Sequence, residues 1–199
     1  MNTKKQTATQ HLFTNKQLRT LLVPIMVEQL LSSLMGTADT MMVSNVGSAA
    51  ISAVSLVDAI NILVIQALSA LAAGGAILCS QYLGSQNLKK AKRSAEQVLF
   101  VMLVLSCSLS LLCLIFRFPL LRLIFGTVDT DVMANSQIYF FFTLLSFPFI
   151  GLYDAGASIL SAQNNTKGPM TISILSNFLN IGGNAILIWV FHLGVAGAA

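Results

Sequence analysis

Four acidic residues lie inside stretches that are otherwise apolar, and they are the residues of this sequence best placed to do chemistry. They are Glu28, Asp39, Asp58 and Asp154. If these stretches cross a membrane, a central carboxylate costs roughly 2.5 to 3.5 kcal/mol, so each acid is expected to face a cavity or a partner. A carboxylate retained at that cost is by default a candidate for ion or proton binding.

Asp39 is the strongest of these candidates because it belongs to a polar stripe. Glu28, Ser32, Gly36 and Asp39 follow one another at spacings of four, four and three residues. This periodicity places them on one face of a helix. Asp39 is therefore predicted to bind a coupling cation or proton. Glu28 is predicted either to line a cavity or to form a hydrogen bond with a polar neighbour.

A second polar stripe occurs near the end of the sequence. Ser173, Asn177, Asn180 and Asn184 repeat at spacings of four, three and four. Amide oxygens ligate hard cations such as Na⁺, and a nearby carboxylate would supply the charge that they lack. We predict a cation-coupling site of Asp39, Asn180 and Asn184, in which Asp39 and Asn180 are candidate Na⁺ ligands, while Asn177 is a candidate for lining a cavity. The asparagines could equally join helices, at about 0.6 kcal/mol per bond.

The remaining two acids have open interpretations. Asp58 shares a helical face with Asn61, and Asp154 shares one with Ser158. Each acid is a candidate for lining a cavity, and each could instead bond to a neighbouring helix.

Composition identifies the elements that hold these residues as membrane helices. The chain of 199 residues is 55% hydrophobic and only 9% charged, whereas a soluble domain carries about 25% charged residues. One bilayer crossing needs about 20 apolar residues. The predicted fold is an all-α polytopic membrane helical bundle with a tail at 1–17 and a transmembrane lobe at 18–199. Apolar runs predict five transmembrane helices, at 18–44, 50–82, 95–116, 136–160 and 169–192.

Three shorter features refine this prediction. Pro24 removes a hydrogen bond from the first helix and is a candidate hinge, although membrane helices also tolerate proline without moving. The small residues at 70–76 predict close helix packing. The segment 117–135 is predicted to form a short interfacial helix followed by a turn.

Basic residues predict how the helices are oriented. With five spans, nine of the 11 Lys and Arg residues fall on the same side as the N-terminus, while Arg117 and Arg122 fall on the other. Because short cytoplasmic loops collect Lys and Arg, the N-terminus is predicted to be cytoplasmic in a multi-pass protein of the cell membrane, plasma or inner. Although the net charge is +4, the basic residues do not gather in one patch with interleaved aromatic residues. No nucleic-acid partner is therefore expected. The nine residues are Lys4, Lys5, Lys16, Arg19, Lys89, Lys90, Lys92, Arg93 and Lys167.

Several motifs together resemble the multidrug and toxic compound extrusion (MATE) family. The first is Pro24 followed by Asp39 within MGTADTMMV and then VGSAAISAV. The second is Gly74-Gly75 leading to QYLG and a basic loop. The third is NIGGN followed by GVAGAA. Their order and spacing run from about residue 18 to residue 199, which is nearly the whole chain.

The resemblance implies a secondary active antiporter of twelve helices in two six-helix lobes, which exports organic cations or drugs in exchange for Na⁺ or H⁺. This chain would be the N-terminal lobe, with the sixth helix and the C-terminal lobe absent. Its partners would be the lipid bilayer, the small-molecule cargo and the missing C-terminal lobe, with no cofactor beyond the coupling ion. The resemblance also matches Asp39 to the family's coupling carboxylate and Asn180 to its partner. Asn184 stands where some branches have Asp, which leaves the choice between Na⁺ and H⁺ open.

The same residues bear on three alternative functions. A lipid-linked oligosaccharide flippase of the same superfamily would need cationic groups for phosphate, whereas the intramembrane charges here are acidic. A non-transporting membrane subunit or truncated remnant is a further alternative. An enzyme is not expected, because no nucleophile and base pair or metal constellation emerges.

Overall fold

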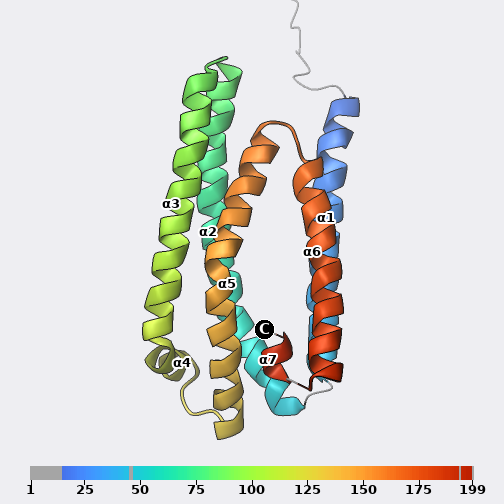
Figure 1. Ribbon diagram of the computed structural model, residues 1–199, viewed down its shortest axis with the longest axis vertical. Coiled ribbons are helices and arrows are strands. Elements are labelled where there is room, and N and C mark those ends of the chain that lie inside the picture. The colour runs from blue at the N-terminus through green and yellow to red at the C-terminus, as the bar shows by residue number, and fades with distance from the viewer. Residues whose placement is uncertain (1–14, 45–46, 193, 199) are drawn as a thin grey trace, which may run out of the picture.

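The structure is a computed structural model that describes residues 15–44, 47–192 and 194–198, so most of the predicted tail at 1–17 lies outside the described residues. Every regular element of the described part is a helix (Figure 1). In chain order the helices are α1 (Asn15–Ser44), α2 (Ser48–Gly84), α3 (Leu88–Ile115), α4 (Arg117–Phe125), α5 (Thr130–Ala162), α6 (Lys167–Ala185), the π-helical turn η1 (Ile186–Val190) and α7 (Val195–Ala198).

The predicted helical membrane bundle is confirmed, whereas the number of five spans is approximate. Among the described residues, four helices are long and apolar enough to cross a membrane: α2, α3, α5, and α6 continued through η1. The 30 residues of α1 also provide enough length, at about 1.5 Å per residue, for a hydrocarbon core of about 30 Å.

The helix boundaries differ most from the prediction at the start of α3, which begins at Leu88 rather than at residue 95, and at the start of α5. This helix begins at Thr130 rather than at residue 136. Asp131 lies in its first turn, where a negative charge interacts favourably with the helix dipole and offsets the polar character of the segment. The predicted short helix within 117–135 is present as α4, whose nine residues end at Phe125 and are followed by Gly126 with a φ of 62°.

The helices pack as two units. Helices α2, α3 and α5 contact one another extensively and form a three-helix unit, while α1 packs mainly against α6 and forms the α1/α6 pair. Figure 1 shows the pair standing beside the three-helix unit. The core of the three-helix unit is built from fully buried apolar side chains, among them Val57, Phe140 and Leu144. Contacts between the two units are sparser than those within them.

Small residues allow the closest contacts of the three-helix unit. A Cβ placed on Gly75 of α2 would lie 2.5 Å from a methyl carbon of Val98 in α3, and one on Gly151 of α5 would lie 2.8 Å from Cβ of Ser106. These approaches agree with the close packing predicted for residues 70–76. Between α3 and α5, the Ser110 hydroxyl donates a hydrogen bond of 2.6 Å to the Leu144 carbonyl.

The connections alternate between the two ends of the bundle. Figure 1 places the start of α1, the turn between α2 and α3 and the turn between α5 and α6 at one end, with α4 and α7 at the other. The basic clusters at 89–93 and at Lys167 therefore lie at the same end, opposite Arg117 and Arg122. This arrangement is the one that the charge pattern predicts, and the cytoplasmic placement of the N-terminus remains a prediction.

Candidate functional site

The structure brings the three predicted coupling residues together where α1 packs on α6. Asn184 Nδ2 donates a hydrogen bond of 2.9 Å to Asp39 Oδ1, across 145 positions of the sequence. The same nitrogen lies 3.3 Å from Asn180 Oδ1, one helical turn earlier in α6. Asn184 is buried and Asp39 is half-buried. We call these three residues the Asp39 cluster.

The Asp39 cluster has the donor set of a hard-cation or proton site. The oxygens of Asp39 and Asn180 both point at one nitrogen, so they converge on a common position. If the Asn184 amide turned over, its own oxygen would face the same position and a third hard ligand would be available. One carboxylate and two amide oxygens suit Na⁺. A proton on Asp39 would neutralise the same charge.

Asp58 lies in a separate cluster inside the three-helix unit. The hydroxyl of Tyr139 in α5 donates a hydrogen bond of 3.0 Å to Asp58 Oδ1, and Asn61 Nδ2 lies 3.4 Å from the same oxygen. Asp58 therefore bonds to a neighbouring helix, which is one of the two interpretations that the sequence left open for each acid. Asp154 of α5 lies near Ser69 of α2, and its Oδ2 is buried with no hydrogen-bond partner among the described residues.

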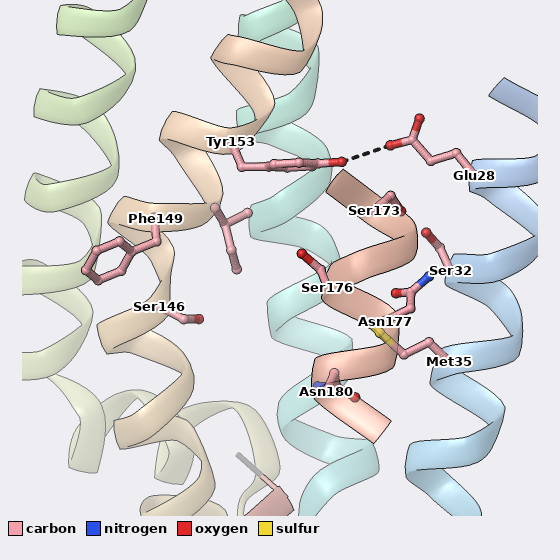
Figure 2. A pocket seen from close by; sticks show the side chains of 11 residues that line it. Glu28, Ser32, Met35, Ser146, Phe149, Tyr153, Ser173, Ser176, Asn177 and Asn180 are labelled. Carbon is pink, nitrogen blue, oxygen red and sulfur yellow. Dashed lines mark hydrogen bonds between the residues drawn. The ribbon is translucent and has the colours of Figure 1, made fainter. Parts of the chain in front are cut away.

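Glu28 forms a hydrogen bond between the two packing units. The hydroxyl of Tyr153 in α5 donates to Glu28 Oε1 in α1 over 3.0 Å, drawn as the dashed line in Figure 2. Ser173 of α6 lies on the other side of the Tyr153 hydroxyl, in the same cleft. One tyrosine thus contacts both helices of the α1/α6 pair.

Below this hydrogen bond lies a cleft of about 520 Å³ between α1, α5 and α6. Glu28 and Asn177, two of the four predicted cavity residues, line it, whereas Asp58 and Asp154 are not among its described lining residues. Asn180 lines the cleft and also belongs to the Asp39 cluster. Figure 2 shows the lining side chains, which are Glu28, Ser32, Met35, Ser146, Phe149, Ile150, Tyr153, Ser173, Ser176, Asn177 and Asn180.

The predicted hinge residue lies within an uninterrupted helix. Pro24 is buried in α1, which continues through it from Asn15 to Ser44. Its role as a hinge remains a prediction.

Sequence reasoning missed the two tyrosines, Tyr139 and Tyr153. Each supplies the hydroxyl that satisfies an intramembrane acid. The signal was available in principle, because a tyrosine in an apolar helix needs a hydrogen-bond partner for its polar tip when buried. Which acid each tyrosine reaches depends on helix packing and could not be read from spacing.

The lobe is all-helical, its helices are long enough to cross a membrane, and carboxylates between them accept hydrogen bonds from asparagine and tyrosine side chains. These features define the chain as part of a polytopic membrane transport protein. The MatE family model matches residues 24–186. The chain belongs to this family, whose members are the multidrug and toxic compound extrusion proteins.

Individual relatives support the assignment over most of the chain. The uncharacterized transporter YisQ of Bacillus subtilis is 32% identical over 181 residues, covering 88% of this chain and 39% of that protein. The mouse multidrug and toxin extrusion protein 2 is 26% identical, covering 88% of this chain and 30% of its own length. The chain therefore spans less than half the length of these relatives.

Solved structures confirm the fold. A MATE protein crystallised in complex with MaD3S superposes with a TM-score of 0.86 at 23% identity, covering 92% of this chain and 41% of that one. An outward-facing multidrug resistance MATE transporter gives a TM-score of 0.85 at 24% identity, with coverage of 92% and 40%.

Proposed function

We propose that this chain is the N-terminal lobe of a secondary active antiporter, which exports organic cations or drugs across the cell membrane in exchange for Na⁺ or H⁺. The observation that carries the proposal is the Asp39 cluster, a carboxylate held by two asparagines between α1 and α6. Family membership and the names of the relatives support export as the activity.

The geometry suggests how an ion would act on the lobe. Asp39 Oδ1 accepts a hydrogen bond from Asn184 Nδ2, so a cation or proton arriving at this oxygen competes with the hydrogen bond that joins α1 to α6. Since Asn184 Nδ2 also lies 3.3 Å from Asn180 Oδ1, its release would rearrange both amides of α6 together. Ion binding would thus change the contact within the α1/α6 pair.

Transport requires this local change to alternate access to a cargo site. Transporters built from repeated bundles move one bundle against the other around a central site. In the proposal the second lobe lies in the remainder of the protein, which accounts for the smaller length of this chain than of its relatives. Binding of ion and cargo would be linked reciprocally through the lobe.

The test replaces the carboxylate in the complete two-lobe transporter. Asp39→Asn preserves shape but deletes the ionisable charge, so efflux of a fluorescent organic cation from proteoliposomes should lose its dependence on an imposed Na⁺ or H⁺ gradient. Asn180→Ala should reduce gradient-driven efflux less, because a neutral ligand contributes less to cation binding than a carboxylate. Asp129→Asn serves as the matched control, since Asp129 is exposed in the connection before α5.

The gradient that drives efflux in the unmodified protein identifies the coupling ion. Wild-type efflux by Asp39→Asn under every imposed Na⁺ and H⁺ gradient would show that Asp39 is only a structural acid satisfied by α6.

A further inference from the structure

A mostly apolar groove of about 230 Å³ runs between α2 and α3. Its described lining contains two polar side chains, Ser94 and Gln97, and no charged one. Leu78 and Val101 are 51% and 50% exposed, so the groove opens to the surroundings of the bundle. Within a bilayer those surroundings are the hydrocarbon chains of lipids. The apolar lining includes Leu71, Gly75 and Leu78 of α2 and Val98, Val101 and Leu105 of α3.

The groove ends in a cation and an aromatic ring at the turn between α2 and α3. The lining residues of α2 recur at spacings of four and three, and the next position of that stripe is Tyr82. On α3, Lys90 precedes Ser94 by four residues and Gln97 by seven, so it lies on the stripe that lines the groove. Lys90 Nζ lies 5.9 Å from the centroid of the Tyr82 ring. Tyrosine is typical of the membrane–water interface, so this pair marks the polar end of the groove.

Positive charge exceeds negative charge around this polar end. Residues 88–96 contain four basic residues and one acidic residue, Glu96. Glu96 Oε1 lies 3.9 Å from Lys92 Nζ, whereas Lys90 and Arg93 have no acidic partner within the described ranges of the chain. Arg93 lines a neighbouring surface depression that shares Gln97 with the groove. Glu96 lines the same depression, but the charge of Lys92 offsets its own.

We propose that this groove binds an anionic phospholipid, whose phosphate lies between Lys90 and Arg93 and whose acyl chain lies between α2 and α3. The two cations are three residues apart, so they are neighbours on α3 and can contact one phosphate. Basic pockets between transmembrane helices are typical sites for acidic lipid headgroups. The headgroup supplies the selectivity, because an acyl chain meets apolar surface in the bilayer as well as in the groove. The inference goes beyond the proposed export function and does not depend on it.

The position of the two cations leaves them accessible to a headgroup. Tyr82 lies in the last turn of α2 and Lys90 in the first turn of α3. Figure 1 shows the turn between these helices standing beyond the turn between α5 and α6. Both Lys90 and Arg93 are exposed. A lipid can therefore place its phosphate at the end of the hairpin while its chain follows the groove toward the middle of the bundle.

The experiment compares two lipids with the same chains, the anionic dioleoylphosphatidylglycerol and the zwitterionic dioleoylphosphatidylcholine. Native mass spectrometry measures their binding to the complete purified transporter in detergent. The unmodified protein should bind the first phosphatidylglycerol at least fivefold more tightly than the first phosphatidylcholine. Equal affinities would overturn the inference, and they are the result expected if another part of the complete protein covers the groove. Because binding is measured without a gradient, its failure would leave the export proposal standing.

Two double variants separate a local site from general attraction to the basic segment. Lys90→Gln with Arg93→Gln removes both proposed phosphate contacts and should weaken phosphatidylglycerol binding tenfold or more. Its phosphatidylcholine binding should stay within twofold, which shows that the variant is folded. Lys89→Gln with Lys92→Gln removes the same charge from the same part of α3 and should bind phosphatidylglycerol within threefold of the unmodified protein. Equal losses in the two double variants, or no loss in the first, would overturn the inference.

A third variant tests the place of the acyl chain. Val101→Trp fills the groove while keeping every basic residue, and it should weaken phosphatidylglycerol binding fivefold or more. Leu111→Trp is the matched control, because Leu111 is 58% exposed on the same helix and does not line the groove. Excess inorganic phosphate should leave the lipid bound, since it has no chain to occupy the groove. Normal binding by Val101→Trp, an equal loss in Leu111→Trp, or displacement by inorganic phosphate would overturn the lipid assignment.

Discussion

Gly75 offers a direct test of the helix packing that supports both sites. Alanine at this position would bring its Cβ to 2.5 Å and 2.9 Å from the two methyl carbons of Val98, and to 3.3 Å from the Val98 Cβ. A change of rotamer cannot relieve all three contacts, because the Val98 Cβ is fixed by the backbone and valine is stiff at χ1. Helices α2 and α3 would have to move apart.

The neighbouring Gly74 provides a matched control, because a Cβ there meets nothing within 4 Å. Both substitutions gain helix propensity of about 0.5 to 1 kcal/mol, and Gly75→Ala adds an overpacking cost of about 1 to 3 kcal/mol. The two variants should therefore differ by about 1 to 3 kcal/mol in free energy of unfolding, which is about 5- to 150-fold in the equilibrium constant.

The assay is reversible unfolding in mixed micelles, with a titration of denaturing detergent followed by far-ultraviolet circular dichroism. Gly74→Ala should unfold at the same or a higher midpoint than the unmodified protein, and Gly75→Ala at a lower one. Equal midpoints for the two alanine variants would refute the close approach of α2 and α3 described here.

Two further predictions concern the orientation and the interior of the bundle. Single cysteines placed at Asp129 and at Lys90 should respectively react with and resist an impermeant thiol reagent in intact cells, and the opposite pattern would reverse the proposed orientation. Ser110→Ala removes the 2.6 Å hydrogen bond to the Leu144 carbonyl and should lower the free energy of unfolding by about 0.6 kcal/mol, with an upper limit near 1.7 kcal/mol. The exposed Ser108→Ala on the same helix should stay within error of the unmodified protein in the same unfolding titration, whereas an equal loss in both would exclude a specific role for the Ser110 bond.

The sequence was sufficient to predict the helical membrane bundle, because the length and hydrophobicity of each apolar run are local properties. It also predicted that Asp39, Asn180 and Asn184 would meet. Each stripe repeats at the helical period, and Asp39, Asn180 and Asn184 all fall in the later half of helices that run in the same direction. Periodicity fixes which residues share a face, and matched depth limits which faces can meet.

Only the tertiary structure decided which helix each face contacts. Glu28 and Asp39 lie on one stripe of α1, yet Glu28 bonds to Tyr153 of α5 while Asp39 bonds to Asn184 of α6. The spacing of a stripe is the same whichever neighbour it faces. The sparser contact between the α1/α6 pair and the three-helix unit separates the two acids into different surroundings, and it leaves the cleft that Glu28 lines.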